Sequence, residues 1–245
     1  MAKIGIIGHG FIGQVHREVI ESGVQELEVG ALVDRDASKL SSFDKYSTYS
    51  SLEDFFNDGK NQIDAVIMAL PIEAHVDAVR EITQRQVPML MEKPLSYSVK
   101  EATQIVEDIR KYKSPVMIGL TGHFHPEFRA AYDSLQRGDI GEIVSMQERI
   151  HFGIPDVEMM GSLVNSESGG GGVGLENGIH TMERLYHFSG SPVISIEGLT
   201  KSHSHLDGKL EDYIAGVAVT ESGFHIPFSL RWNLDKEEDY STGTK

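Results

Sequence analysis

The chain of 245 residues is 40% hydrophobic and 24% charged, which is the composition of a globular protein able to bury a sizeable core. Its 22 lysines and arginines are outnumbered by 37 aspartates and glutamates, and the net charge of −15 argues against nucleic acid as a partner. The lack of cysteine excludes disulfides, thiolate metal sites and a cysteine nucleophile. No apolar run approaches the ~20 residues of a membrane helix and no signal peptide is recognisable, so we expect a cytoplasmic protein without a membrane partner.

The first predicted element is an apolar strand that leads directly into a glycine motif. Residues 4–13 read IGIIGHGFIG, so a G-x-G-x-x-G pattern stands between a strand and a helix-compatible stretch. In a dinucleotide site the first glycine permits a tight turn, the second admits the pyrophosphate to backbone amides, and the third lets helix and strand pack closely. A glycine-rich structural turn is the alternative interpretation. The residues predicted to line the dinucleotide are Gly8, Gly10, Phe11, Ile12 and Gly13.

A second predicted strand, 27–33, ends at an acidic residue with the spacing that a dinucleotide site requires. Asp34 lies about 20 residues past the glycine motif, where its carboxylate would accept hydrogen bonds from the adenosine ribose. The same carboxylate would repel a 2′-phosphate, so we predict that NAD is preferred over NADP. Arg35 keeps NADP possible, since its guanidinium could hold that phosphate.

Strand and helix patterns alternate through the remainder of the first half. The most regular helix begins at Ser98, which forms an S-x-x-E capping box with Glu101. Its predicted apolar face consists of Val99, Ala102, Ile105, Val106 and Ile109. The other predicted elements are helices at 52–56 and 73–85 and strands at 65–69, 88–91 and 116–120. This alternation predicts an α/β fold, with a Rossmann doubly wound parallel sheet over residues 1–120 that binds its ligand at the carboxyl ends of the strands.

The pattern changes near residue 121, where strand-like runs follow one another with few helices. A helix is predicted at 126–137, and strands at 143–151, 193–200, 213–220 and 224–233. Residues 121–245 are therefore expected to form a smaller α+β domain, with a largely antiparallel sheet, for substrate binding and oligomerisation. The last strand places Phe224, Ile226, Phe228, Leu230 and Trp232 on one face. Monomers rarely leave such a row exposed, which predicts a homo-oligomer formed through the outer face of this sheet.

Three side chains outside the glycine motif are candidates for chemistry. Lys93, in the sequence Glu92-Lys93-Pro94 at the end of a predicted strand, is either a catalytic group facing the cofactor crevice or a solvated surface charge. Glu176 and His180 follow a glycine-rich run and are four residues apart, so on a helix they share a face and can converge on one small ligand. A flexible loop followed by a helix-surface hydrogen bond explains the same pattern.

Other polar residues are weaker candidates. His123 and His125 alternate near the presumed substrate crevice, and Asn177 stands between Glu176 and His180, so all three are candidate substrate contacts. The run His203-Ser204-His205 beside Asp207 has the composition of a metal site, but its loop context favours a solvated turn. We predict no metal.

Several short motifs occur in a fixed order along the chain. They are the glycine motif, Asp34-Arg35-Asp36, Ala69-Leu70-Pro71 with His75, Glu92-Lys93-Pro94, GDIGE at 138–142, and Gly171-Gly172 leading to GIH at 178–180. This combination covers nearly the whole chain and resembles the glucose-fructose oxidoreductase, inositol dehydrogenase and rhizopine-catabolism family (Gfo/Idh/MocA). The resemblance implies an NAD-dependent dehydrogenase that transfers hydride between nicotinamide and a carbinol of a sugar, polyol or related compound. It adds Ala69, Leu70, Pro71, His75, Glu92 and Lys93 to the expected cofactor-binding residues.

The resemblance also implies catalytic roles. In that family the lysine of the E-K-P motif lies beside the nicotinamide and the substrate hydroxyl, which implicates Lys93. A D-x-x-x-H motif on a helix of the second domain falls on Glu176 and His180. His180 would then take the hydroxyl proton, Lys93 would stabilise developing alkoxide charge, and Glu176 would orient the imidazole or hold a neighbouring hydroxyl.

The chain departs from the family pattern in several places. Glu176 stands where aspartate is usual, Ile72 replaces a frequent asparagine, and His123 replaces a commonly basic residue. The chain is also shorter than is usual for the family. Ile72 and His123 predict an unusual substrate specificity. The short second domain and Glu176 leave open the alternative of a catalytically silent NAD-binding sensor or scaffold. A further alternative keeps the site but is an enzyme that uses transient oxidation to eliminate a glycosidic substituent.

Overall fold

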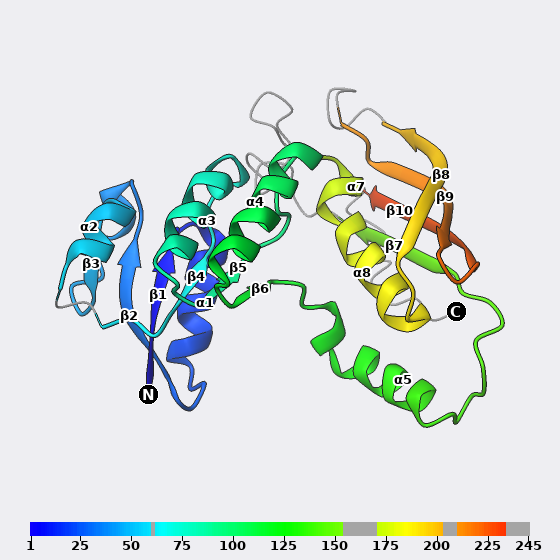
Figure 1. Ribbon diagram of the computed structural model, residues 1–245, viewed down its shortest axis with the longest axis horizontal. Helices are drawn as coiled ribbons and strands as arrows, with labels where there is room; N and C mark the ends of the chain where they lie inside the picture. Colours follow the sequence, from blue (N-terminus) through cyan, green and yellow to red (C-terminus); the bar gives the residue numbers. More distant parts are fainter. Residues whose placement is uncertain (60–61, 154–170, 203–209, 234–245) are drawn as a thin grey trace. The chain divides into compact units, whose positions relative to one another are not determined.

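The structure is a computed structural model that describes residues 1–59, 62–153, 171–202 and 210–233 (Figure 1). It divides into two compact units, Met1–Gly119 and Leu120–Lys245. Each unit has its own sheet, and the first unit has two hydrophobic core clusters and the second has one among the described residues. Among the described residues, no helix combines the length and the apolar character needed to cross a membrane.

The first unit is built on a six-stranded sheet in which every neighbouring pair is parallel. Its strands are β1 (Ala2–Ile7), β2 (Leu27–Val33), β3 (Ser47–Tyr49), β4 (Ala65–Met68), β5 (Met89–Met91) and β6 (Val116–Ile118). The order β3-β2-β1-β4-β5-β6 means that the chain runs outward from β1 and then crosses back to β4 on its other side. The predicted doubly wound parallel sheet is confirmed. In such sheets the reversal of strand order marks the crevice where ligands bind.

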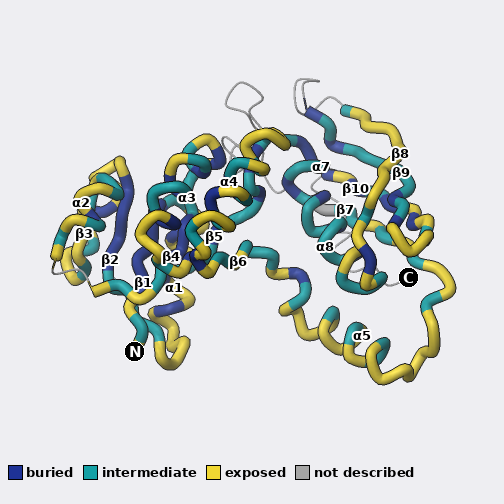
Figure 2. Tube along the Cα trace, viewed as in Figure 1, coloured by how far each residue is buried: buried dark blue, intermediate teal, exposed yellow. Residues whose placement is uncertain are grey.

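Helices cover both faces of this sheet. They are α1 (Phe11–Glu21), α2 (Leu52–Asn57), α3 (His75–Gln84) and α4 (Val99–Tyr112). Successive residues of one strand pack in different hydrophobic cores, because side chains alternate between the two faces of a sheet. Ile6 of β1 packs in a core with Ile20 of α1, whereas Ile7 packs in a core with Ile82 of α3 and Ile105 of α4. Figure 2 shows the buried strands lying between the more exposed helices.

The start of α4 differs in part from the predicted capping box. The Ser98 hydroxyl accepts the backbone N–H of Glu101 at 3.2 Å, as expected. The reciprocal contact runs through Ser96, whose hydroxyl accepts the N–H of Ser98 at 3.1 Å and donates to the Glu101 carboxylate. Val99, predicted on the apolar face, is 84% exposed. It is the first residue of the helix, and helical side chains lean toward the N-terminus, so its side chain projects past the packed part of α4.

The second unit contains a four-stranded sheet in the order β7-β10-β9-β8. Its elements are the strands β7 (Glu148–Gly153), β8 (Val193–Lys201), β9 (Tyr213–Thr220) and β10 (His225–Asn233), with the helices α5 (Pro126–Gln136), α7 (Val173–Glu176) and α8 (Gly178–Ser189). The pairs β10–β9 and β9–β8 are antiparallel, which confirms a largely antiparallel sheet. The pair β10–β7 is parallel, which the sequence patterns did not predict.

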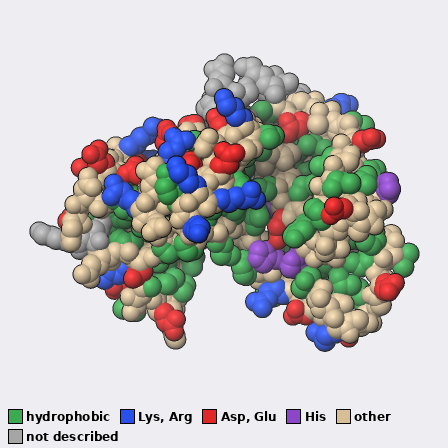
Figure 3. Space-filling model, in the orientation of Figure 1, with side chains coloured by type: hydrophobic (Ala, Val, Ile, Leu, Met, Phe, Trp, Pro, Cys, Tyr) green, Lys and Arg blue, Asp and Glu red, His purple; other side chains and the backbone are tan. Residues whose placement is uncertain are grey.

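The apolar row of β10 packs inside the second unit. Its four buried members share a core with Val173 of α7 and Leu185 of α8. They are Ile226, Phe228, Leu230 and Trp232. The row is not available as an association surface, because these helices already cover it. Apolar side chains do reach the surface of this unit (Figure 3), among them those of Ile194, Ile196 and Leu199 on the edge strand β8. Self-association through the outer face stays a prediction, without the β10 row as its basis.

Candidate functional site

The three glycines of the motif differ in what the fold requires of them. Gly8 has a φ of +91°, and a Cβ there would lie 2.3 Å from the carbonyl oxygen of Ala69. A Cβ at Gly13 would lie 1.9 Å from the carbonyl oxygen of Gly8. At Gly10, by contrast, φ is −75° and an added Cβ would meet no atom of the described part of the chain within 4 Å. The folded chain needs glycine at the first and third positions for its own packing, whereas the second borders open space, as a ligand approach requires.

The N-terminus of α1 borders this opening. Its first intrahelical hydrogen bond joins the N–H of Gln14 to the carbonyl oxygen of Gly10 at 3.0 Å, so the N–H groups of residues 11–13 precede the helical ladder. The side chains of Phe11 and Ile12 are exposed rather than folded over these amides. An 11-residue helix whose first amides adjoin an open glycine fits a pyrophosphate, by hydrogen bonding and by the helix dipole.

Asp34 directly follows β2 and is almost fully buried. Its Oδ2 accepts the backbone N–H of His9 at 2.9 Å, and its Oδ1 accepts the N–H of Asp36 at 2.9 Å. The ammonium of Lys39 lies 3.4 Å from Oδ2. The predicted ribose-binding carboxylate therefore also fastens the glycine loop to the segment after β2. Arg35 is exposed beside it.

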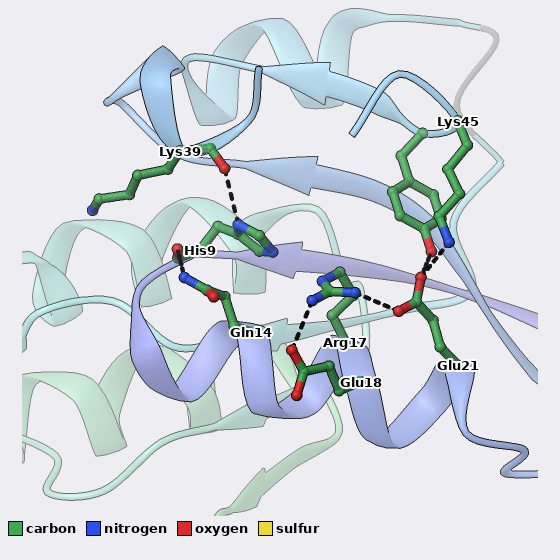
Figure 4. A network of polar contacts seen from close by, with 8 residues as sticks. His9, Gln14, Arg17, Glu18, Glu21, Lys39 and Lys45 are labelled. Atoms are coloured by element: carbon green, nitrogen blue, oxygen red, sulfur yellow. Dashed lines mark hydrogen bonds and ion pairs between the residues drawn. The ribbon is translucent and has the colours of Figure 1, made fainter. Parts of the chain in front are cut away.

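His9, between the first two glycines, is a buried residue that sequence reasoning did not single out. Its Nδ1–H donates to the carbonyl oxygen of Lys39 at 3.2 Å (Figure 4). Its ring meets that of Phe43 edge-on. Burial lowers the pKa of this imidazole, and the charges of Arg17 and Lys39 act in the same direction. Among the described residues, Nε2 has no hydrogen-bond partner. A neutral ring thus braces the glycine loop from inside.

The loop after β4 carries the predicted cofactor contacts Ala69, Leu70 and Pro71. His75, at the start of α3, is fully buried beneath this loop. Its Nε2 lies 3.0 Å from the carbonyl oxygen of Leu70, and its Nδ1 lies 3.1 Å from that of Leu95. Both ring nitrogens are occupied by the backbone of two loops at the carboxyl edge of the sheet. The structure therefore gives His75 the position of a brace between these loops rather than that of a side chain exposed to a ligand.

The E-K-P motif begins directly after β5. Glu92 accepts a hydrogen bond from His16 Nε2 on α1 at 2.7 Å, and its backbone N–H donates to Met68 of β4 at 2.9 Å. A Cβ at Gly119 would lie 3.2 Å from the Glu92 carboxylate, so a residue without a side chain leaves room for it. Lys93 follows at the carboxyl end of the strand and is half-buried. Glu92 and Lys93 are both half-buried, and the Glu92 carboxylate is tied to α1 through His16.

Glu176 and His180 lie on two consecutive helices rather than on one. Glu176 ends α7 and is buried, and half-buried His180 lies in the first turn of α8. The break falls at Asn177, whose φ is −114° and whose Oδ1 accepts the indole N–H of Trp232 at 2.6 Å. The expectation of a shared face on a continuous helix is corrected accordingly. Asn177, a candidate substrate contact, uses its carboxamide oxygen to fasten this junction to β10.

The glycine run before α7 packs closely where the structure describes it. A Cβ at Gly172 would lie 2.2 Å from the Glu211 carboxyl carbon, and the Gly174 N–H donates to Glu211 Oε1 at 3.0 Å. The carbonyl oxygen of Glu211 accepts the N–H of Val173 at 3.0 Å. From residue 171 onward the run is therefore a packed connection to the chain before β9. Residues 169 and 170 lie outside the described part of the chain.

His123 has an acidic partner that sequence reasoning missed. Its Nδ1–H donates to Oε1 of Glu183 on α8 at 2.7 Å. The His123 ring also stacks loosely on His187, at 5.8 Å between centroids. The spacing of His180, Glu183 and His187 along α8 was the available signal, since residues three and seven apart share a helix face. His125 is exposed, with Nδ1 3.6 Å from Glu127.

In the part of the chain that the structure describes, no three His, Cys, Asp or Glu side chains are grouped to hold a metal ion. The run at 203–205 and Asp207, considered above as a metal site, lie outside the described residues. The structure thus brings together two sets of predicted residues, one in each unit. The first is the opening around Gly10 with Asp34 and, at the same edge of the sheet, Lys93. The second is the helix junction with Glu176 and His180.

Comparison with known families accounts for most of the chain. A family model described as an oxidoreductase family with an NAD-binding Rossmann fold matches residues 2–120, and a Gfo/Idh/MocA C-terminal domain matches residues 128–242. The rhizopine catabolism protein MocA of Rhizobium meliloti is 29% identical over 77% of this chain and 57% of its own length. An inositol 2-dehydrogenase of Corynebacterium glutamicum is 21% identical over 95% of this chain and 67% of its own length.

Solved structures show the same fold. A scyllo-inositol dehydrogenase from Lactobacillus casei with bound NAD(H) and scyllo-inositol superposes with a TM-score of 0.82 at 19% identity, covering 95% of this chain and 70% of that one. An oxidoreductase from Agrobacterium radiobacter in complex with NAD⁺, L-tartaric acid and magnesium gives 0.82 at 21% identity, covering 97% and 68%. The chain spans only 57% of MocA and 40% of YrbE, an uncharacterized oxidoreductase of Bacillus subtilis.

Substitution of Gly10 should separate ligand binding from folding. Gly10→Val places a side chain in open space, so it should cost at most about 1 kcal/mol of folding free energy while weakening NAD binding at least about tenfold. Calorimetric titration with NAD, with thermal unfolding of the same samples, measures both. Gly13→Ala is the matched control and should fail to fold, because its Cβ collides with backbone. Unchanged NAD affinity in Gly10→Val would remove this opening from the binding site.

His9 should make the protein less stable in mild acid. Because its pKa is lowered in the folded state, the ring gains a proton in the unfolded chain first as the pH falls below the ordinary histidine value. The contribution of neutral His9 to the free energy of unfolding is complete above about pH 6.5. It is lost on acidification, by at most about 1.4 kcal/mol per pH unit. His9→Asn keeps a neutral donor, so its Tm should fall less than that of the wild type between pH 7.5 and 5. Parallel Tm curves would contradict the prediction.

Proposed function

The chain belongs to the Gfo/Idh/MocA oxidoreductase family, and on this basis we propose that it is an NAD-dependent dehydrogenase acting on a carbinol of a sugar, polyol or related hydroxylated compound. The observation that supports the proposal most directly is the opening at Gly10, because the chain has glycine there although its own packing does not require it. Asp34 stands beside this loop with its carboxylate held by backbone amides. Both features serve a dinucleotide.

The first unit would hold the cofactor through a small set of groups. The amides at the start of α1 would bind the pyrophosphate, and Asp34 would accept the ribose hydroxyls. The loops at Ala69–Pro71 and Glu92–Lys93 would border the nicotinamide, with His75 and His16 fixing their positions from behind. Bound NAD supplies the hydride acceptor, and the protein supplies orientation and electrostatics.

Three side chains would carry the chemistry of the carbinol. His180 would take the hydroxyl proton, a role that histidine side chains often fill as general bases. The Lys93 ammonium would donate a hydrogen bond to the same oxygen and stabilise the alkoxide charge that develops there. Glu176 would orient His180 or hold a neighbouring hydroxyl. Its longer side chain, in place of the family's aspartate, calls for a pocket adjusted by one methylene.

The substrate is best sought among compounds with several hydroxyl groups. The relatives include an inositol 2-dehydrogenase, and a fold neighbour was solved with scyllo-inositol. In this chain His123 stands where the family commonly has a basic residue, and it is paired with Glu183. A histidine–carboxylate pair can both donate to and accept from hydroxyls. We propose it, with His125, as a contact that adapts the site to its own polyol or sugar. We expect the enzyme to act in the cytoplasm.

The test combines a substrate panel with two variants. Wild-type protein is assayed for NADH formation with inositols, free sugars, sugar acids and nucleotide sugars, and its best substrate is carried forward. His180→Ala should lower kcat by about 10² to 10⁴ while leaving NAD affinity nearly intact. Lys93→Met should also lower kcat and weaken NAD binding, because the residue borders the nicotinamide. His225→Ala and Lys100→Met remove exposed side chains of the same types and should change neither quantity.

Each variant must keep the wild-type melting temperature, because unfolding also abolishes activity. Near-full activity of His180→Ala on a verified substrate contradicts the assignment of the base. A wild type that binds NAD and oxidises nothing in the panel supports the sensor or scaffold instead. Release of a glycosidic product without net NADH supports the oxidation–elimination reaction.

A further inference from the structure

Asp34 is not an isolated carboxylate, and this changes which dinucleotides the site can accept. We propose that Lys39 is a cofactor-specificity residue, which enables the adenosine end of the site to bind a 2′-phosphorylated dinucleotide, NADP, as well as NAD. The inference rests on the proposed function, since it concerns the same cofactor site. Asp34 alone predicts discrimination against the 2′-phosphate, because two anions at short distance repel one another.

The contact between the two residues is direct. Lys39 Nζ lies 3.4 Å from Asp34 Oδ2, and the side chains are 44% and 8% exposed, respectively. A half-exposed ammonium beside a buried carboxylate partly offsets its charge, and it keeps hydrogen-bonding capacity toward solvent or a ligand. The backbone N–H groups of His9 and Asp36 already satisfy the two oxygens of Asp34, so the carboxylate does not depend on Lys39 for its hydrogen bonds. The Lys39 ammonium can therefore also meet a ligand that binds beside Asp34.

The backbone at residue 39 is held in place by the rest of the site. Asp36 caps the short 3₁₀ turn Ala37–Lys39, accepting the N–H of Ser38 at 3.1 Å and its hydroxyl at 2.6 Å. The Lys39 carbonyl oxygen accepts the His9 ring N–H, as Figure 4 shows, while the ammonium extends away from that ring. Because the backbone is fixed on both sides, the flexible stem alone decides whether the ammonium faces Asp34 or a phosphate beside it.

The charges along this segment balance. Residues 34–39 carry two carboxylates, Asp34 and Asp36, and two cations, Arg35 and Lys39, in a chain whose net charge is −15. The Asp36 carboxylate is occupied by Ser38, and Arg35 is exposed. A 2′-phosphate would thus approach a neutral segment with two available cations. NAD remains the preferred ligand, since Asp34 still accepts its ribose hydroxyls, but NADP is not excluded.

Equilibrium binding of NAD and NADP to the full chain tests the inference without requiring a substrate. Wild-type protein should bind NADP within about tenfold of NAD at low ionic strength, and the difference should widen as salt screens the lysine. Lys39→Met should lose about tenfold or more in NADP affinity with less than about a twofold change for NAD, because a charged hydrogen bond to phosphate is lost. Lys39→Arg should restore NADP binding.

Lys45→Met is the matched control. Lys45 pairs with Glu21 at the other end of α1 (Figure 4), so its loss changes net charge equally and should leave both affinities unchanged. The inference is overturned if wild-type protein binds NAD but not NADP, if Lys39→Met weakens both ligands alike, or if Lys45→Met reproduces its effect. Failure of folded wild-type protein to bind either dinucleotide would instead refute the proposed function itself.

Discussion

The Asp34 carboxylate is the contact on which the site of the first unit depends. It accepts backbone N–H groups from His9 and Asp36, and so it joins the turn after β1 to the turn after β2. A buried carboxylate is tolerated only when its oxygens are satisfied, and here the backbone of these two turns satisfies them. The residue predicted to meet the ribose is therefore also the one that sets the shape of the glycine loop. Ligand binding and the fold of the glycine loop therefore both require the Asp34 carboxylate.

Local sequence patterns predicted the sheet of the first unit because strands buried on both faces are continuous apolar runs. The exception is β3, which consists of Ser47, Thr48 and Tyr49 and carries no apolar signal. It forms because β2 offers it a free edge for pairing. In the second unit, β7 begins at Glu148 instead of residue 143, and its limits follow its parallel partner β10. Pairing between distant segments leaves no periodic trace in either one.

The site residues, too, were predicted where the signal is local and missed where it depends on a distant segment. The glycines and Asp34 could be predicted because their roles are fixed by spacing within one β-α-β unit. His16 was missed because its partner Glu92 lies 76 residues away, and Glu183 because it meets His123 from 60 residues away. The break between α7 and α8 has one local signal, the dipeptide Asn177-Gly178, which is common in turns. The contact that accompanies the break is long-range, since the indole that donates to the Asn177 carboxamide belongs to Trp232.

Among the three glycines of the motif, only Gly10 is not required by the packing of the chain, so its retention indicates that the ligand is still bound. A Cβ at Gly8 or Gly13 would strike backbone, so any descendant that keeps the fold must keep those two glycines, whether or not it binds a ligand. No atom of the described residues lies within 4 Å of a Cβ placed at Gly10, so the folded chain loses almost nothing when a side chain appears there. Substitution of Gly10 would therefore distinguish related proteins that no longer bind the dinucleotide from those that still do.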